Sequence, residues 1–535
     1  MYTHQALAAD LLTRTDTLFG LIGDANLYLV DSFRDGGGKY VAAAHEAGAV
    51  LMALGYAQAT GRVGVATVTH GPAMTNTVTA LVEGVRGRIP LVLLAGDTPV
   101  EQLENLQDIE QRAVVEGTGA GFEQMRAPRT AVDDLDAAFR RALVERRPVV
   151  LNMPVDFQWR EEAEASGRRT RVSAQRQSPD RDVVEEVVGL LAHSSRPLVL
   201  AGRGAIDVVA REALVELAAR LGAPLATTLK AKGLFQGRRG DVGIFGTLST
   251  PGAADTIARA DTVIAFGAGL NRFTTSGGDL FRGKRVVQVD SDEGALSRHT
   301  VATIGMLGDA ALSARAILRL LDEAEVPASG FVSQVPADAS RVMPAPDVVR
   351  HDGRVDFPSA IDRLEEMVPA DRILVLDGGR FWLECIKRLS VAAPQNYIHT
   401  IHFGSVGLGM AEAIGAGVGR SDRPVLMVTG DGGFMLGGLS EFNAAVRHGV
   451  DLIVAVFNDD AYGAEHIQFT RRGMDPALSV LGWPDLAPVA EALGGLGITI
   501  RSTEDFSEAA RIVAARDRPV LIDIKLDPAD IPFDK

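Results

Sequence analysis

Oxygen-bearing side chains follow two apolar segments near the C-terminal end of the chain. Gly430-Asp431-Gly432-Gly433 comes directly after the segment 425–429, and Asn458-Asp459-Asp460 follows the segment 452–457. The glycines allow backbone N–H groups to approach a phosphate closely. Carboxylate and amide oxygens, together with phosphate oxygens, are ligands that suit a hard cation such as Mg²⁺. The two clusters therefore predict a metal-bridged diphosphate site.

Residues 433–457 must bring the two clusters together. They are long enough for one helix, with Leu439, Phe442 and Val446 at helical spacing, and for a return strand. A strand, a crossover helix and a parallel strand place both strand ends at the carboxyl edge of one sheet, where such sheets bind ligands. Because a strand ending in Gly-Asp-Gly can also be an ordinary turn, the prediction rests on the pair of strand ends.

Together the two clusters resemble the signature of thiamine-diphosphate enzymes, in which Gly-Asp-Gly is followed, one helix and one strand later, by Asn-Asn. Here Asp459 stands at the second Asn position. The resemblance implies side-chain ligands to Mg²⁺ from Asp431 and residue 459, and a carbonyl ligand from Ala461. Whether Asn458 or Asp459 coordinates stays open, because Asp is chemically competent and adds a negative charge. Gly430, Gly432, Gly433 and Tyr462 are further candidate cofactor-binding residues.

The first and last segments of the chain share one plan. Segment 63–69 runs into His70-Gly71-Pro72, and a helix and segment 90–94 follow, while 46–55 matches 407–415 in character. In thiamine-diphosphate enzymes one such domain binds the diphosphate, and its twin from a second subunit binds the aminopyrimidine ring. The resemblance covers essentially all 535 residues. It is closest to the acetolactate synthase, benzoylformate decarboxylase and pyruvate decarboxylase branch.

We predict an α/β fold of three doubly wound parallel-sheet domains, because short Val, Leu and Ile runs alternate with helical patterns. A chain of 535 residues is too long for one hydrophobic core. The polar stretch 160–181 and the proline-containing stretch 324–356 are predicted linkers. The predicted pyrimidine-binding, middle Rossmann-like and diphosphate-binding domains span 1–160, 182–323 and 356–535.

Glu46 is the candidate acid–base group for the cofactor. It begins a helix whose following residues, 47–54, carry no polar side chain, so its carboxyl is expected in apolar surroundings. A first-turn Glu that complements the helix dipole is the alternative. In the family, a Glu in a His-Glu-Ala context hydrogen-bonds the aminopyrimidine and helps to form the ylid nucleophile, and His45-Glu46 matches that motif.

The loop 401–407 resembles the segment that bends the cofactor in this family. The resemblance implies that Val406, where Met or Leu is more usual, lies under the two rings, and that the Gly404 carbonyl accepts from the amino group. Arg380 occupies a position where relatives contact the diphosphate, which suits its charge. A surface salt bridge is the alternative for Arg380.

Three further side chains are expected to transfer protons. His70 precedes Gly71-Pro72, where benzoylformate decarboxylases place a catalytic His, and Asp24 and Glu465 fall on catalytic carboxyls of pyruvate decarboxylases. The alternatives are a structural His, a turn-forming Asp and a Glu on a helix surface. The paired His of pyruvate decarboxylases is missing, and Leu106 replaces the Phe of acetolactate synthases. No single named activity can therefore be transferred.

Composition limits the partners and the compartment. The net charge of −15 argues against nucleic acid, which binds basic surfaces. A single cysteine, Cys385, excludes an internal disulfide framework and favours the cytoplasm. The N-terminal residues lack a basic and apolar signal, and no apolar run reaches the length of a membrane span, so no membrane association is expected.

The predicted function is thiamine-diphosphate- and Mg²⁺-dependent cleavage or formation of a C–C bond in a 2-oxo acid, by decarboxylation, carboligation or both, in a homodimer or homotetramer. The alternatives are an enzyme similar to 2-hydroxyacyl-CoA lyase or oxalyl-CoA decarboxylase, made less attractive by the short tail after Asp523, and a non-catalytic nucleotide-binding scaffold. FAD on the middle domain is possible but not favoured, because Asp207 takes the third glycine position of G-x-G-x-x-G.

Overall fold

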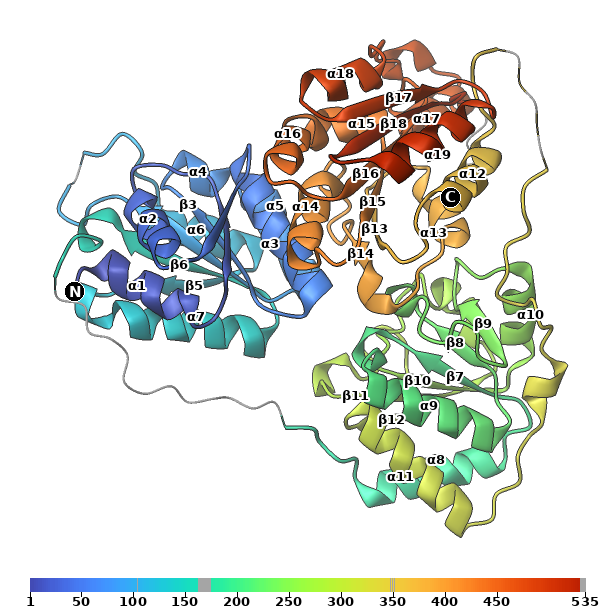
Figure 1. The fold of residues 1–535 in the computed structure, drawn as a ribbon. Coiled ribbons are helices and arrows are strands. Elements are labelled where there is room, and N and C mark those ends of the chain that lie inside the picture. The colour runs from blue at the N-terminus through green and yellow to red at the C-terminus, as the bar shows by residue number, and fades with distance from the viewer. Residues whose placement is uncertain (103, 162–174, 347, 349, 351, 530–535) are drawn as a thin grey trace. The chain divides into compact units, whose positions relative to one another are not determined.

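Three six-stranded sheets of parallel strands form the framework of the chain, with helices packed on them (Figure 1). The structure is a computed structural model that describes every residue except 103, 162–174, 347, 349, 351 and 530–535. The chain divides into two compact units, one with the N-terminal and C-terminal sheets and one with the middle sheet and the segment Lys387–Tyr397. The predicted α/β class with three doubly wound sheets is confirmed.

The N-terminal and C-terminal sheets share one strand order. The first runs β2-β1-β3-β4-β6-β5 and the last β14-β13-β15-β16-β18-β17, so corresponding strands occupy corresponding places. The first sheet comprises β1 (Thr17–Gly20), β2 (Lys39–Ala42), β3 (Gly64–Val68), β4 (Leu91–Asp97), β5 (Gly121–Gln124) and β6 (Pro148–Pro154). The last comprises β13 (Ile373–Leu376), β14 (Tyr397–His399), β15 (Val425–Gly430), β16 (Leu452–Asn458), β17 (Leu496–Ile500) and β18 (Val520–Lys525). The duplication seen in the sequence thus extends to the topology.

Helices cover the N-terminal and C-terminal sheets. Strands such as β16 are therefore buried along their whole length, and their sequences are continuous apolar runs. The N-terminal domain contains α1 (Thr3–Leu12), α2 (Leu27–Asp35), α3 (Glu46–Thr60), α4 (Pro72–Thr75), α5 (Val78–Gly87), α6 (Gln111–Thr118) and α7 (Ala131–Glu145). The C-terminal domain contains α12 (Phe357–Met367), α13 (Trp382–Arg388), α14 (Gly409–Gly419), α15 (Asp431–Gly433), α16 (Leu439–Arg447), α17 (Gly463–Arg471), α18 (Leu486–Ala492) and α19 (Asp505–Ala515).

Helices α3 and α14 join the two duplicated domains (Figure 1). Both are apolar on nearly every face, as expected for helices buried on all sides. They touch through their backbones: a Cβ on Gly55 would lie 2.0 Å from the Glu412 carbonyl oxygen, and one on Gly415 would lie 1.8 Å from that of Met52. Glycine is therefore required at the same place in each helix.

The middle sheet runs β12-β11-β10-β7-β8-β9, the strand order of dinucleotide-binding folds. Its strands are β7 (Pro197–Ala201), β8 (Leu225–Thr227), β9 (Asp241–Ile244), β10 (Thr262–Phe266), β11 (Arg285–Asp290) and β12 (Ile304–Leu307), and its helices are α8 (Arg181–Ala192), α9 (Val208–Leu221), α10 (Pro251–Arg259) and α11 (Ala310–Glu323). Within the predicted linker 324–356, Phe331 and Ala339 are buried in the core of this domain. In the predicted linker 160–181, residues 162–174 lie outside the described part of the chain.

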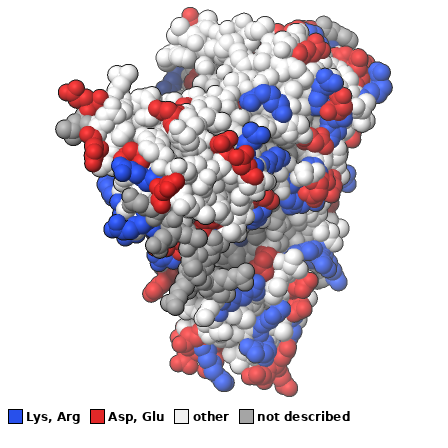
Figure 2. Space-filling model, turned by 60° about the vertical axis from the view of Figure 1, so that its left-hand side comes forward, with Lys and Arg blue, Asp and Glu red and all other residues white. Residues whose placement is uncertain are grey.

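Basic and acidic side chains are interspersed on the face shown in Figure 2. Among the described residues on that face, the basic side chains therefore form no continuous surface of the kind that nucleic acids bind. In the described part of the chain, no helix combines the length and the apolar character needed to cross a membrane.

The contact between α3 and α14 makes a prediction about Gly415. Gly415→Ala should lower the midpoint of thermal unfolding by about 5 °C or more, because the new methyl group collides with a backbone carbonyl that has no rotamer to escape into. The matched control is Gly189→Ala, also in a helix interior, where an added Cβ meets no atom within 4 Å. Equal midpoints for the two variants would contradict the close packing.

Candidate active site

The two oxygen-rich strand ends lie side by side. β15 and β16 are parallel neighbours with Gly430 paired to Phe457, so Asp431 and Asp459 leave the same edge of the sheet. Both side chains are buried. Burial, followed by the charge of Asp459, raises the pKa of Asp431 to about 8, and burial also raises the pKa of Asp459 against the opposing effect of Arg380. Two buried carboxyls in this state are stabilised as anions by a cation.

Unpartnered polar atoms at this edge test whether the predicted ligands fit. Asp431 Oδ2 is buried without a hydrogen-bond partner. The Arg380 guanidinium donates from Nε (3.1 Å) and Nη2 to Asp459 Oδ2, whereas its buried Nη1 has no partner. Such atoms are costly when left unpaired. The free carboxylate oxygen suits a divalent cation and the free N–H suits a phosphate oxygen, so the residues fit a metal-bound diphosphate.

Asn458 is engaged with the protein through both ends of its amide. Its Nδ2 donates to Asp523 Oδ1 at 2.8 Å, and its Oδ1 accepts from the backbone of Asp460 at 3.1 Å. Asp460 has a left-handed backbone (φ 55°), which turns the chain so that the Ala461 N–H donates to Asp459 Oδ1 at 3.3 Å. Asn458 therefore ties β16 to β18, and Asp459 is the residue of the pair that faces Arg380.

β15 runs directly into a helical stretch made of α15, a π-helical turn (Phe434–Gly438) and α16. The start of such a stretch points backbone N–H groups at a ligand and favours an anion. A Cβ on Gly432 would lie 2.8 Å from the Tyr462 ring, and one on Gly433 would lie 2.8 Å from Asp377 Oδ2. The predicted glycines and Tyr462 thus lie together at the edge that carries Asp431.

The loop 401–407 is fixed beside this edge by Asp377, to which the sequence analysis gave no role. The Gly407 N–H donates to both Asp377 oxygens, at 3.1 and 3.0 Å, and the Thr429 hydroxyl donates at 3.0 Å. Burial raises the pKa of Asp377 to about 6 even though these donors lower it. The anchored loop leaves Val406 about two-fifths exposed and Gly404 open to solvent, so both can meet a ligand.

A second polar cluster lies at the carboxyl end of β3 in the N-terminal domain. The His70 ring, which is buried, has its Nδ1 3.0 Å from Thr69 Oγ1 and 3.5 Å from Asp24 Oδ1. Thr69 also donates to Asp24 at 2.9 Å. Asn76, which follows this cluster along the chain, donates from its Nδ2 to Glu46 at 3.0 Å. The structure therefore brings His70 and Asp24 together, and it adds Thr69 and Asn76, which sequence reasoning missed.

Two buried glutamates hold the loops that lead to these clusters. Glu83 of α5 accepts from the backbone N–H groups of His402 (2.8 Å) and Phe403 (2.7 Å). Glu441 of α16, the corresponding helix of the twin domain, accepts from those of Ala44 and His45, both at 3.1 Å. Each duplicated domain thus positions the active-site loop of the other.

Three family models match successive parts of the chain. The N-terminal TPP binding domain of thiamine pyrophosphate enzymes matches residues 2–117, the central domain of these enzymes matches 184–317, and their C-terminal TPP binding domain matches 377–524. The chain belongs to the thiamine pyrophosphate enzymes. The predicted family is confirmed, with thiamine pyrophosphate (thiamine diphosphate) as its cofactor, and the non-catalytic scaffold is set aside.

Relatives resemble the chain along nearly its whole length. It is 28% identical to "Probable 2-ketoarginine decarboxylase AruI" of Pseudomonas aeruginosa, over 94% of this chain and 89% of the relative. It is 26% identical to "Acetolactate synthase large subunit IlvB1" of Mycobacterium tuberculosis, over 95% and 85%. It is 24% identical to "Probable acetolactate synthase large subunit" of Methanococcus aeolicus, over 96% and 90%.

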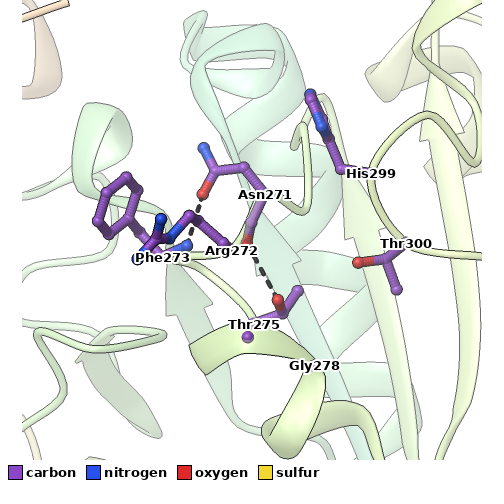
Figure 3. Close-up of a pocket in the computed structure, with 8 residues that line it drawn as sticks. Asn271, Arg272, Phe273, Thr275, Gly278, His299 and Thr300 are labelled. Atoms are coloured by element: carbon purple, nitrogen blue, oxygen red, sulfur yellow. Dashed lines mark hydrogen bonds between the residues drawn. The ribbon is translucent and has the colours of Figure 1, made fainter.

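The central domain of this thiamine pyrophosphate enzyme contains a cavity of about 420 Å³ (Figure 3). The cavity is lined by residues of the segment that follows β10 and by His299 and Thr300. Asn271 shapes that segment, because its Oδ1 accepts from the Phe273 N–H at 3.0 Å and its carbonyl accepts from the Thr275 hydroxyl at 3.1 Å.

Asp207 fills the place that binds phosphate in dinucleotide-binding domains. It caps α9, with its Oδ1 accepting from the Val209 and Ala210 N–H groups, both at 3.0 Å. These donors at the start of a helix are the ones that would otherwise meet a phosphate.

In the C-terminal domain, Glu465 lies exposed in the first turn of α17, and its catalytic role stays a prediction.

The buried position of Glu441 predicts a pH dependence. Burial raises its pKa from 4.5 to about 7, against the lowering effect of the Ala44 and His45 N–H groups. A raised folded-state pKa stabilises the fold below the unfolded value and loses that contribution as the pH rises through the folded value. The unfolding free energy of the wild type relative to Glu441→Gln should therefore increase from pH 8 to pH 5, by at most about 3 kcal/mol.

Unfolding of both proteins at several pH values between 5 and 8 checks this prediction. Glu186→Gln, which changes an exposed glutamate of α8, is the control and should follow the wild type throughout. A difference between wild type and Glu441→Gln that stays constant, or that shrinks in acid, would rule out the proposed titration.

Proposed function

We propose that this enzyme cleaves or forms the C–C bond beside the keto group of a 2-oxo acid, using thiamine diphosphate and Mg²⁺. The observation that carries the proposal is the pairing of unsatisfied atoms at one sheet edge, Asp431 Oδ2 for the metal and Arg380 Nη1 for the diphosphate. The names of the relatives, a 2-ketoarginine decarboxylase and acetolactate synthases, support decarboxylation, carboligation or both.

The residues of the diphosphate edge would hold the cofactor. Asp431, Asp459 and the Ala461 carbonyl would coordinate Mg²⁺, while the backbone at 430–433 and Tyr462 would enclose the diphosphate. Asn458, whose amide is engaged elsewhere, would support Asp459 rather than bind the metal. Thiamine diphosphate, when bound, supplies a nucleophilic carbon and an electron sink for the substrate.

Side chains of the twin domain would manage the protons. Glu46 would exchange a proton with the aminopyrimidine nitrogen, and Val406 and Gly404 would orient the rings. His70, held by Thr69 and Asp24, would give or take a proton at the substrate oxygen, a task for which His is suited near neutral pH. Glu465, which is exposed in the first turn of α17, would protonate the product.

We also propose a homodimer or homotetramer in which Glu46 serves the diphosphate edge of a neighbouring chain. Apolar side chains at that edge are 39–62% exposed in the single chain: Phe403, Val406, Leu436 and Tyr462. An exposed apolar surface of this kind commonly marks an interface. The predicted domains, 1–160, 182–323 and 356–535, then act as pyrimidine-binding, middle and diphosphate-binding parts.

We propose a cytoplasmic location, with which the single, buried cysteine of the chain, Cys385, is in keeping.

For the central domain we propose a structural role without FAD. The support is the Asp207 carboxylate, which repels a phosphate from the start of α9. An enzyme that acts on a 2-hydroxyacyl-CoA is the second candidate function, and CoA esters therefore belong in the substrate panel.

The test is an incubation of the purified protein with thiamine diphosphate, Mg²⁺ and a panel of 2-oxo acids. We expect CO₂ from at least one acid, and acyloin products if a second carbonyl compound is accepted. The absence of CO₂ and of new C–C bonds with every 2-oxo acid, together with cleavage of a 2-hydroxyacyl-CoA, would replace the proposal by the second candidate.

Asp431→Ala should abolish cofactor retention. The change removes a metal ligand and leaves the diphosphate charge poorly neutralised beside Asp459 and Asp460. Calorimetric titration of thiamine diphosphate in the presence of Mg²⁺ measures the effect. Binding at wild-type strength would remove Asp431 from the metal site.

Glu46→Gln should bind the cofactor as the wild type does but slow proton exchange at the thiazolium carbon by about 10²–10⁴-fold. An amide of the same shape cannot share a proton with the pyrimidine ring. NMR of quenched samples follows the exchange, and an unchanged rate would exclude Glu46 from proton transfer.

A further inference from the structure

Arg380 and Asp459 form a buried ion pair at the predicted metal site. Their side chains are 3% and 6% exposed, and Nε and Nη2 of the guanidinium both contact Asp459 Oδ2. The sequence predicted a diphosphate contact or a surface salt bridge for Arg380. Neither prediction included Asp459 as its partner. The two residues are 79 positions apart, so only the fold brings them together.

The surrounding backbone is shaped to hold this pair. A Cβ at Gly463 would lie 2.3 Å from Arg380 Nε and 2.7 Å from Asp459 Oδ2, so the chain has room here only for a glycine. Phe381, next to Arg380, packs against Phe457 with ring centroids 6.1 Å apart, which fixes the backbone on both sides. The pair is thus a built feature of the edge rather than a chance surface contact.

Charge explains why the pair occurs at this position. The family signature has a neutral Asn where this chain has Asp459, so the carboxylate adds one negative charge beside Asp431 and the diphosphate. The positive charge of the Arg380 guanidinium cancels this extra negative charge, so that Asp431, Asp459 and Arg380 together carry the same net charge as an Asp and an Asn. It also occupies Asp459 Oδ2 and leaves Oδ1 as the oxygen that can turn towards a cation.

We propose that Arg380 and Asp459 work as one unit, in which the guanidinium neutralises the carboxylate ligand and offers its free Nη1 to the diphosphate. This inference deepens the proposed function and rests on it for the identity of the anion. It makes Arg380 a positioning residue for the metal ligand as well as a diphosphate contact. If the two residues work as one unit, removing Asp459 should partly reverse the loss caused by removing Arg380. If they act independently, removing both should cost more than removing either one.

The test is a double-mutant cycle of Arg380→Gln, Asp459→Asn and the double variant. In the cofactor-free protein each single change leaves a buried charge without its partner, so each should lower the midpoint of thermal unfolding. The double variant, which buries two neutral amides, should melt above both singles. Arg518→Gln, which breaks an exposed ion pair with Asp517, is the control and should melt like the wild type.

Calorimetric titration of thiamine diphosphate with Mg²⁺ gives the second readout. Arg380→Gln should bind about tenfold or more weakly, because it removes a donor and leaves two carboxylates beside the diphosphate. Adding Asp459→Asn should strengthen binding again relative to Arg380→Gln, although it alters a predicted metal ligand. For two independent residues the double variant would instead bind more weakly than either single variant.

The outcomes separate the unit from the proposed function. Melting effects that simply add, or a double variant that binds no better than Arg380→Gln, would overturn the unit. A wild type that fails to bind thiamine diphosphate would overturn the proposed function and the diphosphate role of Arg380, while the melts still report the pairing. If Arg380→Gln does not fold, Arg380→Lys replaces it, and its binding should be weakened because an ammonium lacks the fork that serves two partners.

Discussion

The backbone contact between α3 and α14 is the constraint on which the candidate site depends. Gly55 and Gly415 allow each helix to rest against a carbonyl of the other, so the twin domains meet at a distance that no side chain could permit. At that distance Glu83 and Glu441 reach across to the loops of the opposite domain. Those loops lead to Glu46 on one side and to Gly404 and Val406 on the other. The contact within one chain therefore holds in place the two loops that each contribute one half of a site, and we propose that a neighbouring chain supplies the other half.

Buried charge is the second organising feature. Asp377, Asp431 and Asp459 are all removed from water, and each is balanced differently. Asp377 is satisfied by donors from the loop and from Thr429, whereas Asp459 is balanced by Arg380. Asp431 alone keeps a buried oxygen without a partner. An unpaired atom of this kind lowers the stability of the isolated chain and favours a bound cation, as is common at functional sites.

Local patterns were enough to predict the sheets and the strand-end clusters. Residues adjacent in sequence specify the apolar runs of β15 and β16, the helix between them and the Gly-Asp-Gly turn. The parallel pairing of β15 and β16 followed from the length of the segment that connects them. Asp431 and His70 could be singled out because they follow apolar strand segments, and Asp24 because it matches a carboxyl of pyruvate decarboxylases. The buried segment around Phe331 was taken for a linker, since its prolines mask its few apolar positions.

Long-range partners could not be predicted in this way. Glu83 contacts a residue 319 positions away and Glu441 one 397 positions away, and each looks like an ordinary polar residue of an amphipathic helix. The anchoring role of Asp377 and the pairing of Arg380 with Asp459 likewise depend on which strand ends become neighbours. A signal for Asp377 was present, a carboxylate at the end of a buried strand, but its donors were not identifiable from sequence spacing.

The most direct test of the account asks whether two chains assemble one site. Glu46→Gln and Asp431→Ala proteins, each inactive, are mixed under conditions in which tagged subunits exchange, and CO₂ release from an accepted 2-oxo acid is measured. In a shared site, one interface of a mixed dimer collects both lesions and the other collects none, so part of the activity should return. Activity that stays at zero despite proven exchange would show that each chain carries its own complete site, which contradicts the account.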